Sequence, residues 1–352
     1  MSGAILRALL GAVATSLAVF AATAAPVPDD GQGNAIAALA QSGALAGSSG
    51  FLDRLHERTS SPEILEQQGA TGGFLSGYGD RTRWDDTARS RSWGLSAGFM
   101  TGMDEGLGAG LTLAAGTARH NIAASATLNR NLATEYLAAL HARLGAPGQP
   151  FNLTLAAGHG WTSNDFVREG AASGTLTARD VSARQWFASV ALGHNWKPVD
   201  GFVLTGFARV DAARIRQDAY GELPLDGATL VPAAISAAEA TSLRSLLGAR
   251  TTLGLAAGRR GATLSIHAAW AHEFETDRSV GFSRVITDPL GGAPTTVTGV
   301  ALAPRIDDNS IHAGASVEAP VTDTARIYLG YNALFASSRD SQSAEAGLRV
   351  TW

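Results

Sequence analysis

The sequence predicts an all-β fold, a 12-stranded antiparallel transmembrane β-barrel, and three observations predict it. After Gly69, apolar and polar residues alternate with a period of two through 12 segments, the pattern of strands with one apolar face. The connections between these segments alternate between short turns and long loops, which is typical of a membrane barrel. The strand number is even, so both ends of the closed sheet lie at one rim, and closure leaves no sheet edge in lipid.

The last segment, 342–352, shows the alternation clearly. One face carries Ala344, Ala346, Leu348, Val350 and Trp352, and the other carries Glu345, Gly347, Arg349 and Thr351. In a soluble sheet the apolar face would cover a core, whereas in a membrane barrel it would meet lipid and the charged face would line the lumen. One strand leaves both alternatives open. Repetition of the pattern along the chain, together with the sorting of the loops, favours the membrane barrel.

The expected strands follow one another along the chain with connections of very unequal length. They lie at about 73–81, 92–101, 106–116, 133–144, 150–162, 184–196, 201–212, 242–255, 261–274, 310–320, 325–336 and 342–352. The connections 197–200 and 321–324 are short, whereas 213–241 and 275–309 are long. A soluble β-sandwich has no reason to sort its loops in this way, so the connections predict one short-turn rim and one long-loop rim.

The length of the sixth expected strand matches a membrane. Trp186 and Trp196 share its apolar face, ten residues apart, and we predict that they belong to an aromatic girdle. Ten residues span about 33 Å along a strand. Tilted by about 40°, this covers about 25 Å of the membrane normal, the height of the apolar band between aromatic girdles.

The composition excludes several classes of function. Charged residues make up 16% of the chain, the net charge is −4, and Lys197 is the only lysine, so nothing favours a nucleic-acid partner. The chain has no cysteine, which excludes disulfides and thiolate chemistry. We expect no cofactor and no bound metal.

The N-terminal 25 residues have the pattern of a cleaved signal peptide. Arg7 precedes an apolar run, 8–22, and small residues follow before Pro26. The alternative, a membrane-spanning helix, needs about 20 apolar residues, and no later stretch reaches that length. We therefore expect residues 1–25 to direct export, 26–72 to form a short passenger and linker, and 73–352 to form the barrel.

Five segments carry a resemblance to a known family. They are GFLSGYGD (73–80), GLSAGF (94–99), GLGAGL (106–111), AWAHEF (269–274) and AGLRVTW (346–352). With these segments in this order, the chain from about Gly69 to Trp352 resembles the C-terminal translocator β-domain of autotransporters, the type V secretion proteins of Gram-negative bacteria. The resemblance covers roughly four fifths of the chain.

The resemblance implies an N-terminal α-helical segment in the pore, at about 51–68, and a location in the cell outer membrane. It implies that inward-facing charges line the lumen and hold this helix: Glu135, Arg143, Arg209, Asp211, Arg244, Arg250, Glu318, Arg326, Glu345 and Arg349. It also implies that Leu348, Val350 and Trp352 form the signal read by the barrel-assembly machinery. Trp352 stands where the family more often has Phe.

The implied partners are outer-membrane lipid and lipopolysaccharide, the Sec translocon and the barrel-assembly machinery, with the barrel itself a monomer. The passenger departs from the family pattern. About 25 to 45 residues lie between the expected cleavage site and the strands, too few for a β-helix or an enzyme domain. The helix segment also lacks the Asn-Asn cleavage site of one branch. A short displayed passenger, a remnant gene and a stand-alone barrel remain alternatives.

An outer-membrane enzyme, phospholipase-like or protease-like, is a further alternative. The motif at 94–98 fits the G-x-S-x-G nucleophile elbow, but Ser96 lies within an alternating strand and not in the strand–turn–helix context that the elbow needs. His141, His267 and His312 share the lumenal face, where solvated histidines are the simpler interpretation.

Paired carboxylates suggest calcium only weakly. The pairs 85–86 and 307–308 lie in expected loops without the ligand spacing of a calcium loop. A passive porin-like channel is the last alternative, and a helix in the pore distinguishes the translocator from it.

Overall fold

The computed structural model describes residues 35–59, 71–84, 88–104, 106–123, 127–145, 149–170, 174–225, 231–255, 261–275, 279–286, 294–302 and 307–352. The expected signal peptide, residues 60–68 of the expected pore helix and the carboxylate pair 85–86 lie outside these described residues.

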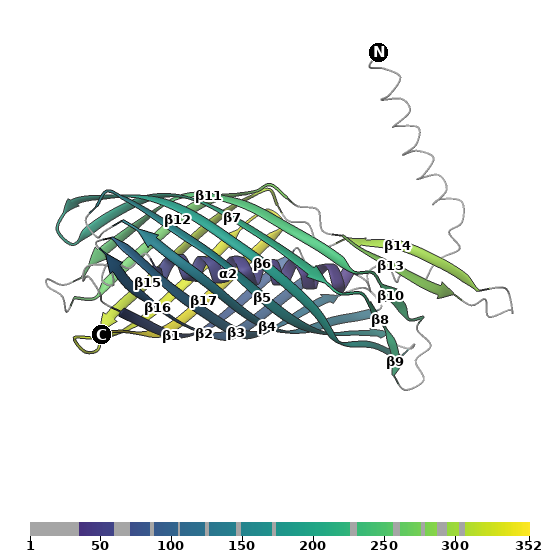
Figure 1. Cartoon of the computed structure of the whole chain (residues 1–352). Helices are drawn as coiled ribbons and strands as arrows, with labels where there is room; N and C mark the ends of the chain where they lie inside the picture. Colours follow the sequence, from purple (N-terminus) through teal and green to yellow (C-terminus); the bar gives the residue numbers. More distant parts are fainter. Residues whose placement is uncertain are drawn as a thin grey trace, which may run out of the picture.

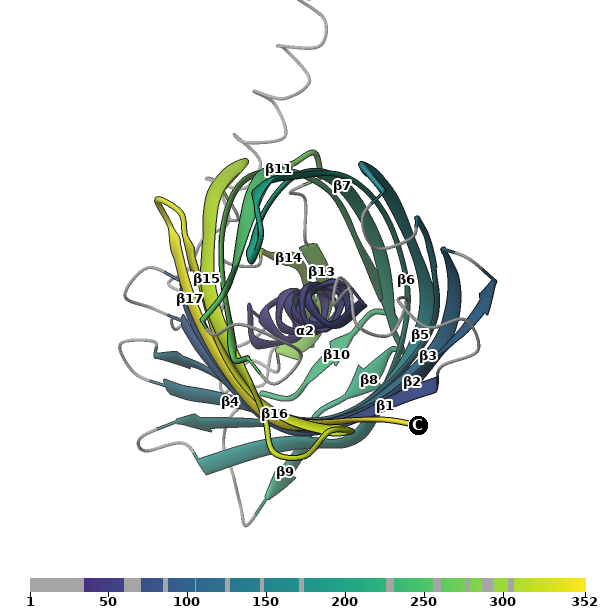
Figure 2. The same cartoon turned by 90° about the vertical axis from the view of Figure 1, so that its left-hand side faces the viewer.

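Twelve antiparallel strands form a closed barrel around a helix (Figures 1 and 2). They are β1 (Thr71–Trp84), β2 (Ala88–Asp104), β3 (Leu107–Ala123), β4 (Thr127–Leu144), β5 (Phe151–Gly170), β6 (Gly174–Val199), β7 (Phe202–Gln217), β11 (Ala238–Gly254), β12 (Thr263–Glu273), β15 (Asn309–Pro320), β16 (Ala325–Phe335) and β17 (Arg339–Thr351). Each pairs with its neighbours along the chain, and β17 pairs with β1 to close the ring. The predicted 12-stranded antiparallel barrel is confirmed.

Several strands run further toward the long-loop rim than predicted. The expected strands 150–162 and 184–196 are β5 (Phe151–Gly170) and β6 (Gly174–Val199), so most of the connection predicted at 163–183 is sheet. The same holds for 117–132, which β3 and β4 occupy up to residues 123 and 127. The apolar–polar alternation reports only the part of a strand that meets lipid, whereas backbone hydrogen bonding continues beyond it.

The two longest connections at the long-loop rim contain strands that the sequence analysis missed. β8 (Tyr220–Gly221), β10 (Ala233–Ile235), β13 (Ser279–Ile286) and β14 (Thr295–Leu302) form a four-stranded sheet, and β9 (Leu223–Leu225) adds to β6. The β13–β14 hairpin projects beyond the rim (Figure 1). These strands have no lipid-facing side, so they lack the long alternation that identifies the barrel strands.

One helix, α2 (Ala35–Thr59), lies inside the barrel (Figure 2). The predicted pore helix, 51–68, therefore overlaps α2 only at 51–59, because α2 begins 16 residues earlier. By length and composition α2 is apolar enough to cross a membrane, but here the barrel wall covers its apolar residues. Before residue 51 the sequence indicates only a weak helix at 34–41 and does not join it to the predicted pore helix, because Gly and Ser residues between them lower helix propensity.

Two glycines of α2 face wall side chains that leave no room for a methyl group. A Cβ atom at Gly43 would overlap the imidazole of His120, and one at Gly47 would lie 2.9 Å from Oε2 of Glu135. Gly50 is different, since the nearest atom is Nη1 of the flexible Arg54, at 3.5 Å. The helix approaches the wall closely at the first two glycines and not at the third.

We expect alanine to act with opposite signs at these positions. Gly50→Ala should stabilise the folded barrel by up to about 1 kcal/mol, because alanine favours a helix. Gly43→Ala should destabilise it by about 1–3 kcal/mol, because overpacking against the His120 ring outweighs that gain. The temperature at which the SDS-resistant form is lost measures both effects. A Gly43→Ala barrel as heat-resistant as the Gly50→Ala control would contradict the close approach.

Candidate functional site

On one side, α2 packs against the lumen wall through an apolar face. Phe51, Leu52 and Leu55 are buried against side chains of β3, β4, β5 and β6. The ring of Phe51 meets that of Phe187 edge-on, with centroids 5.5 Å apart. This packing settles which face of the helix turns to the wall and directs its charged residues toward the remaining strands.

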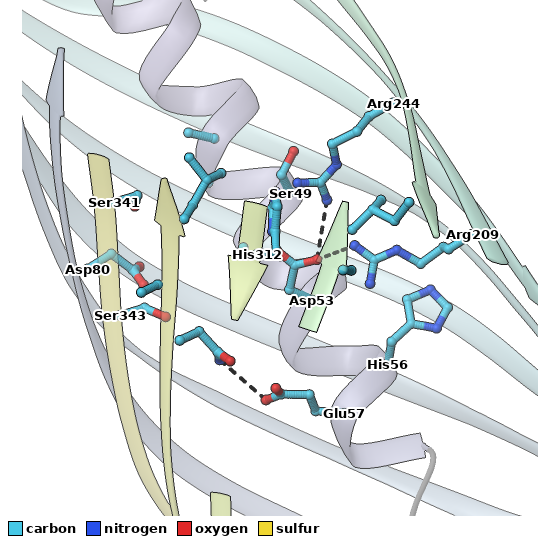
Figure 3. Close-up of a pocket in the computed structure, with 18 of the residues that line it drawn as sticks. Ser49, Asp53, His56, Glu57, Asp80, Arg209, Arg244, His312, Ser341 and Ser343 are labelled. Atoms are coloured by element: carbon cyan, nitrogen blue, oxygen red, sulfur yellow. Dashed lines mark hydrogen bonds and ion pairs between the residues drawn. The ribbon is translucent and has the colours of Figure 1, made fainter. Parts of the chain in front are cut away.

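A buried ion network fastens the middle of α2 to β7 and β11 (Figure 3). Asp53 pairs with the guanidinium groups of Arg209 and Arg244. Both arginines also pair with Asp211, at 2.9 and 2.7 Å, and Ser189 donates a hydrogen bond to Asp211 at 2.6 Å. Two carboxylates thus balance two arginines in a site with little solvent, where an unpaired charge would be costly.

Arg58 fastens the end of α2 to the strands that close the barrel. It forms an ion pair with Glu345 on β17, and it donates hydrogen bonds to Ser76 at 2.7 Å and Ser96 at 3.0 Å. Its guanidinium lies 4.2 Å from the ring centroid of Phe74, a cation–π arrangement. One helix side chain therefore bridges β1, β2 and β17.

Further contacts complete the attachment of the helix. Arg54 pairs with Asp80 on β1 at 3.2 Å, and Glu57 lies 3.5 Å from the imidazole of His267. Arg143 donates a 2.5 Å hydrogen bond to the carbonyl oxygen of Thr59, the last residue of α2. A cation at a helix C-terminus is favourable because the terminal carbonyl groups lack intrahelical partners.

The remaining predicted lumen charges also lie on the inner side of the wall. Glu318 forms ion pairs with Arg326 at 2.7 Å and with Arg349 at 2.9 Å, a network within the wall itself. Arg250 lines the space beside the helix, and Glu135 faces Gly47. The strand face alone identifies these wall residues as inward. It assigns no role to the charged residues of α2 that face the wall, Asp53, Arg54, Glu57 and Arg58. Their mixed charge within 51–58 was the available signal.

An apolar cluster surrounds the start of α2 at the long-loop rim. Ile36 and Leu39 pack with Trp84, Phe166 and neighbouring buried residues. Tyr220 stacks on Phe166 with centroids 4.9 Å apart, and burial raises the pKa of its hydroxyl above the usual range. The helix therefore begins at the long-loop rim and ends toward the short-turn rim, where β4 turns into β5 (Figure 1).

The space left beside α2 is lined by both polar and apolar side chains. A cavity of about 180 Å³ and a second of about 110 Å³ lie along the helix, and Glu57, Arg250 and His267 line both. Ser96 accepts a hydrogen bond from Arg58 and shares one with Ser76 at 2.8 Å, and among the described residues no histidine is seen to bond to it. The geometry gives Ser96 an anchoring contact and no general base.

The three lumenal histidines contact different residues, and Asp307 of the carboxylate pair 307–308 lies at the long-loop rim. His141 bonds to Thr112 at 3.3 Å, His267 faces Glu57, and His312 lines the larger cavity. Asp307 accepts hydrogen bonds from Ser337 and Ser338, which link two connections at the long-loop rim. Among the residues with described positions, no group of three or more His, Asp or Glu is arranged to hold a metal ion.

The outer face carries the aromatic and apolar residues. Trp186 and Trp196 are 63% and 57% exposed, and Trp352 is 69% exposed. Leu348 also faces outward on β17, whereas Val350 is half-buried. These residues lie where lipid surrounds a membrane barrel, and the inner face carries the ion networks.

A family model identifies the family of this chain, and solved structures show its fold. The family model for the autotransporter β-domain matches residues 70–332. The translocator domain of the autotransporter NalP from Neisseria meningitidis is similar in structure, with a TM-score of 0.66 and 15% identity over 89% of this chain and 98% of that one. The β-domain of the Bordetella autotransporter BrkA has a TM-score of 0.57 at 16% identity, covering 80% and 99% of the two chains.

The transport unit of AIDA-I from Escherichia coli has a TM-score of 0.54 and 12% identity, covering 81% of this chain and 90% of that one. No curated protein sequence matches the chain. The family match spans most of the chain, and the barrel with its enclosed helix has the architecture of these translocators. The chain belongs to the autotransporter β-domain family and is a non-catalytic translocator barrel of the Gram-negative outer membrane.

Proposed function

We propose that this barrel carries the segment preceding α2 through its lumen and holds it at the cell surface. The observation that supports this is the direction of α2, which begins at the long-loop rim and ends toward the short-turn rim. In an outer-membrane barrel the long loops are extracellular. A chain that enters α2 from the outside must already have crossed the lumen, and α2 then remains as the plug.

The remaining steps of this proposal concern delivery and insertion. Residues 1–25 direct the chain through the Sec translocon, and residues 26–34 belong to the displayed segment. The barrel-assembly machinery reads the outward-facing side of β17, with Leu348, Val350 and Trp352 as the recognised residues. The folded barrel is a monomer, and Trp186 and Trp196 lie at the two aromatic girdles, since each is exposed on the outer face of β6.

An epitope inserted after Pro28 tests the direction of transport. We expect antibody to label this epitope on intact cells, because the segment before α2 lies outside. The matched control is the same epitope in the short turn at Asp200, between β6 and β7, which should be labelled only after the outer membrane is permeabilised. Labelling of the Pro28 epitope only in permeabilised cells would show that the segment has not crossed.

A further inference from the structure

Five arginines gather on the outer face of β1, β2 and β3 near the long-loop rim. Arg81, Arg91 and Arg119 are directly opposite one another on these three adjacent strands, and Arg83 is opposite Arg89 one step further out. All five are exposed. The three strands lie side by side on the barrel (Figure 1), so these residues form one surface, the arginine patch.

The arginine patch lies at the height of lipid headgroups. Trp93 is two residues from Arg91 on the same outward face of β2 and marks the aromatic girdle. Two residues span about 6.6 Å of strand, or about 5 Å of membrane normal at a tilt of about 40°. The same step on β6 leads from Trp186 to Arg184, which is opposite Arg216. Both places put arginines just outside the girdle of the extracellular leaflet.

Few carboxylates lie beside the arginine patch in the part of the chain that the structure describes. Like charges directly opposite on neighbouring strands are destabilising, because their Cβ atoms are only about 4.5–5.5 Å apart. Within the described residues, Arg83 has a carboxylate partner, Asp340 at 3.6 Å, and no ion pair is found for the other four arginines of the patch. The other side of the barrel differs, since Glu239 pairs with Arg214 there at 2.6 Å.

We propose that the arginine patch binds the phosphate groups of lipopolysaccharide in the extracellular leaflet. The planar guanidinium fork accepts a phosphate in a bidentate geometry, and three aligned forks offer enough donors for the two phosphates of a lipid A headgroup. The Arg stems lie along the apolar surface above Trp93 while the charged ends reach the headgroups. The bound phosphates remove the repulsion between the strands. This inference rests on the outer-membrane location and not on export of the N-terminal segment.

Binding of lipid A to the purified full-length chain in detergent tests the proposal, with native mass spectrometry as the readout. The test variant carries Arg81→Gln, Arg91→Gln and Arg119→Gln. We expect its affinity for diphosphorylated lipid A to fall at least about tenfold, because three charge-assisted contacts to phosphate are lost. The matched control removes three exposed arginines of β6 and β7 near Glu239, Arg184→Gln, Arg214→Gln and Arg216→Gln, and should change affinity by less than about twofold.

Two further lipids test whether phosphate is the group that binds and whether lipopolysaccharide is its source. Dephosphorylated lipid A and phosphatidylglycerol should each bind the unmodified chain at least about tenfold more weakly than diphosphorylated lipid A. Equal binding of dephosphorylated lipid A would overturn the phosphate contact, and equal binding of phosphatidylglycerol would overturn the assignment to lipopolysaccharide. Unchanged affinity in the test variant would overturn the site. If that variant does not form an SDS-resistant barrel, the single change Arg91→Gln, at the centre of the row, decides in the same assay.

Discussion

Removal of residues 350–352 should abolish the membrane-inserted, heat-modifiable barrel while leaving export to the periplasm intact. These residues lie in β17 where it pairs with both of its neighbours, β1 and β16. Val350 is opposite Gly73 on β1 and Ala325 on β16, and the backbones of Thr71 and Trp352 exchange hydrogen bonds of 3.1 and 2.9 Å. Without these residues β1 has unpaired backbone groups at its start, and each unpaired group in a membrane costs several kcal/mol.

An alanine variant separates closure of the sheet from recognition of the side chains. Leu348→Ala, Val350→Ala and Trp352→Ala together keep every backbone hydrogen bond of β17 but remove the proposed assembly signal. We expect slow or incomplete insertion from this variant, with normal heat resistance in the fraction that inserts. Thr351→Ala, on the opposite face, is the matched control and should insert normally. Insertion of the truncated chain at the normal level would refute the central role of β17.

The barrel strands were predictable from sequence because lipid imposes a period of two on each of them. Trp270 and Leu140 must face outward once the barrel is assumed, and the residues opposite them must then face the lumen. Where the strands rise above the lipid this constraint ends. The extensions of β5 and β6 and the sheet of β8, β10, β13 and β14 therefore left no comparable pattern.

The lumenal contacts were predictable only in part. Strand face identified Arg209 and Arg244 as inward, but their shared partner Asp53 is 156 and 191 residues away in the chain. That pairing depends on the rotation and depth of α2, which the packing of Phe51 and the close approach at Gly43 determine. The glycines conceal such a helix, because they lower helix propensity and also let the helix approach the wall closely.

Deletion of residues 26–68 should raise the single-channel conductance several-fold. An α-helix with its side chains is about 10–12 Å wide. It lies inside the lumen and packs against the wall, and cavities of about 180 and 110 Å³ lie beside it in the described part of the chain. The wall itself should persist, because the strand pairing that closes it does not involve α2. Planar-bilayer recording of the refolded deletion variant beside the full chain measures the change, and the SDS-resistant band confirms that both barrels are closed.

A single charge reversal should move the full chain part of the way toward that open state. Asp53→Lys replaces the ion pairs to Arg209 and Arg244 with repulsion, and breaking a buried pair costs about 3–5 kcal/mol. We expect frequent openings to the conductance of the deletion variant. Asp53→Asn, which removes the charge without repulsion, should open less often, and Asp53→Lys with Arg244→Asp should restore closure. Equal conductance of the full chain, the deletion and Asp53→Lys would show that α2 does not plug the pore.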